Sequence, residues 1–104
     1  MGMCKPSGGI EKIYGPYGRN IKEIINQTPN SRIDYYDEKT GKLLQQRWFD
    51  ADGKAVWDRD WDHNDSNNTH EFPHDHYWVW DNPQHPDRPE YKGPNGENIN
   101  SSYC

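Results

Sequence analysis

The sequence has few large apolar residues: only 13 of its 104 residues are Leu, Ile, Val or Phe. Hydrophobic residues of all kinds make up 30% of the chain, whereas globular domains usually have roughly 45–50%. A composition this polar is typical of disordered chains. The chain also holds 5 Trp, 7 Tyr and 2 Phe, and one aromatic side chain can bury roughly 150–250 Å². We therefore expect one small domain with an aromatic core.

Long apolar runs and a cysteine framework are also missing. The longest apolar run is residues 77–80, far short of the about 20 residues that a membrane-spanning helix needs. Residues 1–6 contain no apolar stretch of the signal-peptide kind. The two cysteines, Cys4 and Cys104, are either free thiols of a reducing compartment or a disulfide between the chain ends. By themselves they do not make a metal site.

The chain has no excess of positive charge, since 17 acidic residues face 12 Lys and Arg and the formal net charge is −5. This balance argues against a general binder of phosphate backbones, but it leaves room for a nuclease with a local basic patch. The sequence contains no Gly-rich phosphate loop, no G-x-S-x-G, no C-x-x-C and no H-E-x-x-H. These absences disfavour kinases, dinucleotide-binding enzymes and serine hydrolases.

A short helix is predicted over residues 20–27. Ile21, Ile24 and Ile25 follow the i, i+3, i+4 spacing of one helix face. Asn20 is a candidate N-cap, and Pro29 follows the segment where a helix would stop. We expect the isoleucines to pack on a sheet.

An antiparallel meander is predicted over residues 31–62. Its three strand-like runs are joined by two turns, which end in Gly41-Lys42 and Gly53-Lys54. Glycine tolerates the positive φ that tight hairpins require. In the last run, side chains alternate between two faces, which puts Asp58 and Asp60 on one face. The three runs are residues 33–36, 43–49 and 55–61.

The expected fold class is therefore α+β: a short N-terminal helix packed on a small antiparallel β-meander, followed by a His-rich loop and an irregular tail. Residues 77–80 are a candidate short strand. Trp48, Trp57, Trp61 and Ile24 are the expected core. The expected organisation is a flexible N-terminal arm over residues 1–18 and a single domain over residues 19–104, divided into the meander at 31–62, the His-rich segment at 63–80 and the loop-rich tail at 81–104.

Four of the five histidines lie between residues 63 and 76, and three uses of them remain open. In acid–base catalysis, two imidazoles would donate and abstract protons, as metal-independent RNA cleavage requires. A Lys or Arg would stabilise the charge on phosphorus. The candidate cations are Lys54, Arg59, Arg88 and Lys92. The histidines are His63, His70, His74 and His76.

The second use is a metal site, either catalytic or structural. The pattern His74-x-His76 on an extended segment puts both imidazoles on one side, which suits Zn²⁺ or another divalent ion. His70 or Asp58 would complete the ligand shell, with His63, Asp60 or Asp62 as alternatives.

The third use is purely structural, with the histidines forming hydrogen bonds to the backbone beside the tryptophans.

The spacing around Pro73 suggests which histidines react. Proline favours an extended residue before it, so Phe72 is expected to anchor in the core. Residues two apart on an extended segment emerge on the same side, and Trp78 and Trp80 continue this parity. The resulting hypothesis is a reactive centre of His74 and His76, with His70 as second acid–base group or third ligand and Asp60 orienting one imidazole.

About half of the chain, residues 48–94, resembles the C-terminal toxin domains of bacterial polymorphic (contact-dependent, Rhs/WapA-like) toxin systems and their phage-borne relatives. The stretches that carry this resemblance are F-D-x-D-G-K-A at 49–55, D-x-D-W-x-H at 58–63, H-x-F-P-H-x-H-x-W-x-W at 70–80 and Y-K-G-P at 91–94.

The resemblance implies a nuclease-type toxin domain, most plausibly an RNase, that a cognate immunity protein neutralises. Such a domain acts in the cytoplasm of a target bacterial cell and arrives there as part of a larger secreted protein or from a phage. The matching residues are His63, His70, His74 and His76 for the motif histidines and Asp58 and Asp60 for the acidic pair. The alternative function is a non-enzymatic metal-binding or interaction module of a phage or secreted bacterial assembly.

Overall fold

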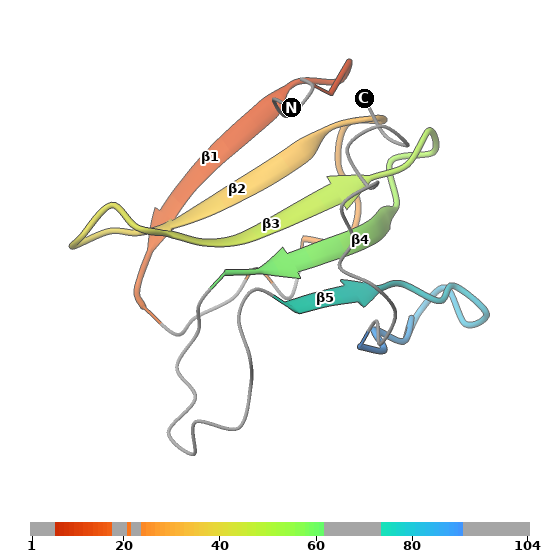
Figure 1. Cartoon of the computed structure of the whole chain (residues 1–104). Coiled ribbons are helices and arrows are strands. Elements are labelled where there is room, and N and C mark those ends of the chain that lie inside the picture. Colours follow the sequence, from red (N-terminus) through yellow and green to blue (C-terminus); the bar gives the residue numbers. More distant parts are fainter. Residues whose placement is uncertain (1–5, 18–20, 22–23, 62–73, 91–104) are drawn as a thin grey trace.

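The computed structural model describes residues 6–17, 21, 24–61 and 74–90. These residues form one sheet of five strands in the spatial order β1-β2-β3-β4-β5 (Figure 1). His63, His70, Cys4 and Cys104 lie outside the described residues. The strands are β1 (Ile10–Gly15), β2 (Arg32–Asp37), β3 (Leu43–Phe49), β4 (Ala55–Asp60) and β5 (His74–Tyr77).

The centre of the sheet is an antiparallel meander at the positions that the hairpin signals indicate. β2 pairs with β3 and β3 pairs with β4, both antiparallel. Gly41 and Gly53 have φ of 74° and 78° in the two turns, the left-handed region that favours glycine. At Gly53 a Cβ atom would stand 2.3 Å from the carbonyl oxygen of Gln27. The second turn therefore excludes a side chain for two reasons.

The sheet is mixed rather than purely antiparallel, because β1 pairs parallel to β2. Its residues, 10–15, fall inside the segment expected to be a flexible arm. Gly15 lies against the ring of Tyr35, whose hydroxyl donates a 2.8 Å hydrogen bond to the carbonyl oxygen of Pro16. This contact fixes the end of β1 on the neighbouring strand.

The predicted α+β class is wrong, because the described residues contain no helix, including those of the predicted helix at 20–27. Beside one bond within the segment, from the Ile24 amide to the Ile21 carbonyl at 3.2 Å, the described backbone there bonds to the sheet. The Ala55 amide donates to the Ile25 carbonyl at 2.9 Å, and the Gln27 amide donates to the Gly53 carbonyl at 2.8 Å. The isoleucine spacing that resembles a helix face instead supplies separate anchor points, since Ile21, Ile24 and Ile25 all reach the core.

The histidine pair lies on a strand instead of a loop. β5, which begins at His74 and includes His76, pairs antiparallel with β4. Beyond it, two isolated bridges attach the following segment: His76 to Glu90 and Val79 to Asp87. Part of the expected loop-rich tail thus closes back on β5.

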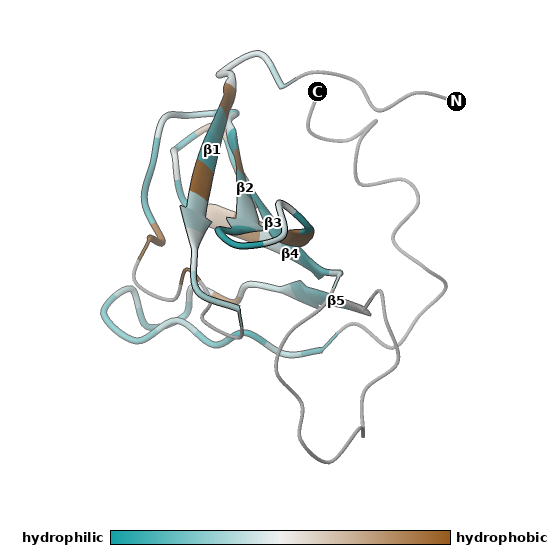
Figure 2. Ribbon diagram, turned by 90° about the vertical axis from the view of Figure 1, so that its left-hand side faces the viewer, coloured by the Kyte–Doolittle hydropathy of each residue, from teal (hydrophilic) through white to brown (hydrophobic). Residues whose placement is uncertain are grey.

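The hydrophobic core lies on one face of the sheet, between the strands and the side chains of Ile21, Ile24 and Ile25. Figure 2 shows how little of the chain is strongly hydrophobic. Trp48 is buried, as expected, but Trp57 is only half-buried and Trp61 is 36% exposed. The expectation of a buried Trp61 is therefore wrong. The core residues are Ile21, Ile33, Tyr35, Leu44, Phe49 and Ala55, with Ile13, Ile24, Ile25, Trp78 and Trp80 packed against them.

Among the described residues, no helix is long and apolar enough to cross a membrane. This agrees with the absence of long apolar runs in the sequence.

Candidate active site at the pairing of β4 and β5

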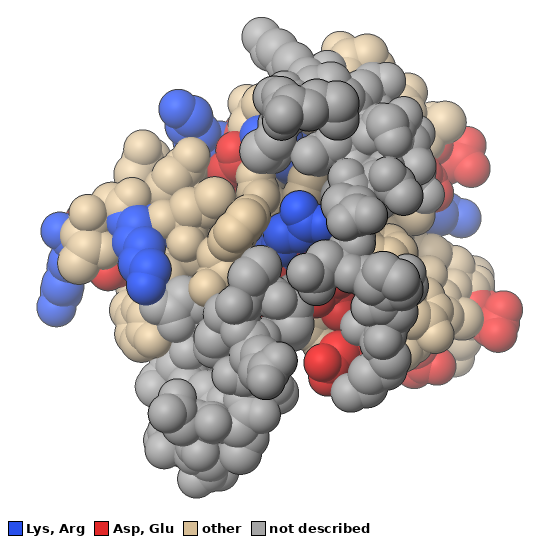
Figure 3. Space-filling model, viewed as in Figure 1, with Lys and Arg blue, Asp and Glu red and all other residues tan. Residues whose placement is uncertain are grey.

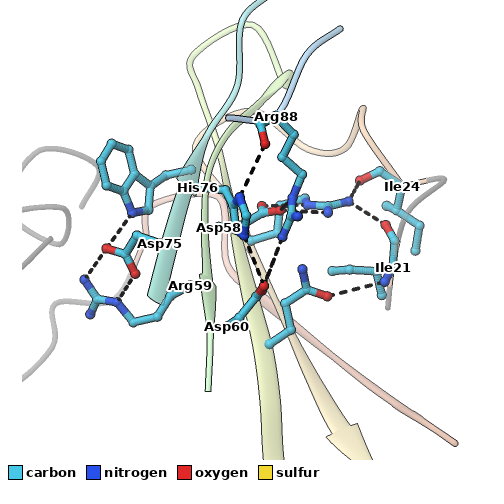
Figure 4. A network of polar contacts seen from close by, with 11 residues as sticks. Ile21, Ile24, Asp58, Arg59, Asp60, Asp75, His76 and Arg88 are labelled. Atoms are coloured by element: carbon cyan, nitrogen blue, oxygen red, sulfur yellow. Dashed lines mark hydrogen bonds and ion pairs between the residues drawn. The ribbon is translucent and has the colours of Figure 1, made fainter. Parts of the chain in front are cut away.

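The register between β4 and β5 brings the aspartates and histidines of the sequence pattern together. Asp58 stands opposite His76, and Asp60 stands opposite His74. The Nε2 atom of His76 lies 3.4 Å from Oδ2 of Asp60, and its Nδ1 atom lies 3.3 Å from the carbonyl oxygen of Arg88 (Figure 4). Both contacts join strands or segments that are distant in the sequence.

The two contacts of His76 have a chemical consequence. Both neighbours, a carboxylate and a carbonyl, accept hydrogen bonds. A neutral imidazole donates from only one nitrogen, while an imidazolium donates from both. The protonated ring therefore fits both neighbours, and the neutral ring leaves one nitrogen as an acceptor. The two contacts therefore fix the orientation of the His76 ring.

Arg88 connects the two carboxylates of β4. Its Nε donates to Asp58 Oδ2, and its Nη2 lies 3.3 Å from Asp60 Oδ1. Nη1 makes no hydrogen bond to any residue that the structure describes, and 26% of the side chain is exposed. A partly exposed guanidinium beside a histidine is suited to binding a phosphate oxygen.

Asp58 and Arg47 form the buried base of the cluster. Arg47 Nε and Nη2 donate to the two oxygens of Asp58 at 2.7 and 2.8 Å. Arg47 Nη1 donates to the carbonyl oxygens of Ile21 and Ile24, and the Trp78 ring lies 4.8 Å from the guanidinium. Arg47 therefore uses its donors to hold Ile21, Ile24 and Asp58.

The partners of Asp58 bear on the metal alternative. Its carboxylate is fully buried and is already bound by two guanidinium groups, so it does not fit the role of a metal ligand. In the part of the chain that the structure describes, no group of three or more His, Cys, Asp or Glu side chains is arranged to hold a metal ion.

The opposite face of the same strands carries a second polar network. Asp75 accepts from Arg59 Nε at 2.9 Å and from Trp57 Nε1 at 3.0 Å. Arg59 was one of the candidate cations, but it lies on this face, away from His76 (Figure 4). Lys54, another candidate, packs over the Trp80 ring at 5.5 Å.

The structure thus brings together four of the candidate residues: His76, Asp60, Asp58 and Arg88. His74 occupies the register position opposite Asp60, and its side chain is outside the description. Arg47 was not predicted as part of the site. No local signal marks it, because its partner Asp58 is 11 residues away.

The face of the molecule that Figure 3 shows is unevenly charged. On the face that Figure 3 shows, basic side chains gather on the left, around the β2–β3 turn, and acidic side chains gather at the lower right, on the side of β5.

Comparison with known proteins adds no family to this description. No protein-family model matches the sequence, and no curated protein and no solved structure is detectably similar to it.

Proposed function

We propose that this chain is a nuclease-type toxin domain, and specifically an RNase that uses histidine acid–base chemistry. The observation that carries the proposal is the position of His76, which is held between the Asp60 carboxylate and the Arg88 carbonyl. The Arg88 guanidinium lies in the same cluster. An imidazole can both donate and accept a proton, which suits it to general acid–base catalysis.

The reaction that these groups suit is transesterification of RNA. A base removes the proton of the ribose 2′-hydroxyl, and the 2′-oxygen then bonds to phosphorus while the bond to the 5′-oxygen breaks. An acid gives the 5′-oxygen a proton, and the product ends in a 2′,3′-cyclic phosphate. His76 supplies one of the two proton transfers, and His74, His70 and His63 are the candidates for the other.

The remaining residues position the His76 ring and stabilise the charge on the phosphate. Asp60 orients the His76 ring through Nε2. Arg88 binds the phosphate and offsets the negative charge that develops on its oxygens. Asp58 and Arg47 hold Arg88 and the strands in place, and they take no part in proton transfer because both side chains are buried.

The toxin part of the proposal follows from the resemblance of residues 48–94. On that basis, a cognate immunity protein is the expected protein partner, and the cytoplasm of a target bacterial cell is the expected place of action.

The test compares RNA and DNA of the same sequence, each with and without EDTA. The proposal predicts that RNA alone is cleaved, that the products carry 2′,3′-cyclic phosphate ends, and that EDTA has no effect. Cleavage of DNA at a similar rate, or loss of RNA cleavage in EDTA, would support metal-dependent hydrolysis instead. Binding without any cleavage would support the non-enzymatic interaction module.

A further inference from the structure

Trp61 is an exposed aromatic residue that is nevertheless held in place. It directly follows β4, and 36% of it is exposed. Its Nε1 donates a 2.8 Å hydrogen bond to Oε1 of Gln46, which is itself 2% exposed. Gln46 in turn donates to Asp34 at 3.1 Å. The indole plane is thus set by a buried chain of polar contacts.

Behind Trp61, guanidinium groups and indole rings alternate across the sheet. The Arg59 guanidinium lies 6.0 Å from the Trp61 ring and 5.9 Å from the Trp48 ring. The Arg32 guanidinium lies 5.7 Å from Trp48, on the other neighbouring strand. Asp75 and Asp34 fix the two guanidiniums through paired hydrogen bonds. Hydrogen bonds therefore hold this series of rings and guanidiniums in place, and Trp61 is its exposed end.

Indole rings and guanidinium groups are the side chains on which nucleobases stack. A planar base placed on the exposed side of Trp61 would extend the alternation of π systems and guanidiniums. Because the ring is held before binding, little side-chain freedom is lost when a base stacks. The base must be unpaired, since the bases of a duplex are covered by their own neighbours.

The location also connects Trp61 to the candidate active site. Asp60, which contacts His76 and Arg88, immediately precedes it. Consecutive strand residues point to opposite faces, so the indole and the Asp60 carboxylate lie on opposite sides of the end of β4. A single RNA strand that crosses this end can reach both.

The geometry points to Trp61 as a stacking site for an unpaired RNA base next to the cleaved phosphate, which makes single-stranded RNA the substrate. This inference rests on the proposed RNase function. It gives a binding role to Trp61, which was expected from the sequence to lie in the buried core.

The test measures binding separately from cleavage. The probe is a 2′-O-methyl oligonucleotide, which lacks the attacking hydroxyl, offered as a single strand and as a duplex. We expect Trp61→Leu to weaken single-strand binding about 5- to 150-fold, the range for loss of one stacked base, and to leave duplex binding unchanged. Trp61→Phe keeps an aromatic face while it also loses the bond to Gln46, and should stay within about threefold of the unsubstituted protein.

Tyr14→Leu is the matched control, because Tyr14 is 58% exposed and belongs to β1, at the far edge of the sheet. Equal losses in Tyr14→Leu and Trp61→Leu, or equal losses in Trp61→Phe and Trp61→Leu, would overturn the stacking site. If RNA is cleaved but Trp61→Leu binds the single strand normally, the inference fails while the RNase function stands. If the unsubstituted protein neither binds nor cleaves RNA, both fail.

Discussion

Arg47 and Asp58 form a two-pronged ion pair in the interior of the sheet, with 1% and 0% of their side chains exposed. The pair joins β3 to β4, and the third nitrogen of the guanidinium holds the carbonyl groups of Ile21 and Ile24. In a domain with so few aliphatic residues, this contact attaches Ile21 and Ile24 to the sheet. The pair also shows that the two aspartates of β4 differ in role. Asp58 is structural, whereas Asp60 contacts His76.

Asp58→Asn is expected to lower the free energy of unfolding by about 3–5 kcal/mol, because it leaves the buried charge of Arg47 without its main partner. Denaturant unfolding measures the change. Asp52→Asn is the control, since Asp52 is exposed in the β3–β4 turn, and it should unfold at nearly the same midpoint as the unsubstituted protein. Equal midpoints for Asp58→Asn and Asp52→Asn would refute the structural role of the pair.

Trp48→Ala is expected to cost about 3–5 kcal/mol of unfolding free energy, the usual range for truncating a buried aromatic residue. Trp48 is 1% exposed and lies under the guanidiniums of Arg32 and Arg59. Trp61→Ala should cost less, because its ring is partly exposed. Thermal and denaturant unfolding of both variants measure these losses. The loss of unfolding free energy should be larger for Trp48→Ala than for Trp61→Ala.

Asp37 gives the fold a specific dependence on pH. The Thr40 hydroxyl and the Lys39 amide donate to its carboxylate and hold its pKa below the ordinary value of 3.8. A carboxyl group with a lowered pKa in the folded state stabilises the fold above its unfolded pKa, and this contribution disappears as the pH falls through the folded-state pKa.

Asp37→Asn should therefore be less stable than the unsubstituted protein at pH 6, and the difference should shrink as the pH is lowered from about 4. Urea midpoints measured from pH 6 to pH 2 provide the comparison. A difference that stays constant over this range would show that the charge of Asp37 does not matter.

Arg88→Lys tests the proposed phosphate-binding role. Lysine keeps the charge but lacks the planar fork that reaches Asp58, Asp60 and a phosphate together. We expect kcat for RNA cleavage to fall about 10²- to 10³-fold, as for loss of one donor to a developing charge. The unfolding midpoint is measured in parallel. An unchanged kcat would remove Arg88 from the mechanism.

The meander could be predicted from sequence because its signals are local. Gly41 and Gly53 mark turns whose φ values only glycine adopts easily, and the strands between them are short. The helix prediction failed because Ile21, Ile24 and Ile25 carry the same spacing whether they line a helix or reach into a core from an irregular segment. Parallel pairing of β1 with β2 has no local signal, since its partners are 22 positions apart.

The sequence could predict only the part of the candidate site that depends on the alternation of side chains along a strand. Alternation along β4 and β5 places Asp60 and His76 on one face, and a single antiparallel pairing then brings them together. Arg88 is 28 residues from Asp60 and reaches it through the bridge between Glu90 and His76. Its contacts depend on how the tail closes on β5, which no spacing in the sequence encodes.

His76 is proposed to transfer a proton in RNA cleavage, and His76→Gln removes the imidazole that would do so. His85→Gln is the matched control, because His85 is exposed in the segment after β5. With both variants folded, single-turnover cleavage by His76→Gln should be about 10²- to 10⁴-fold slower than that of the unsubstituted protein, and His85→Gln should be unchanged. A folded His76→Gln variant that cleaves RNA at the original rate would contradict proton transfer by His76.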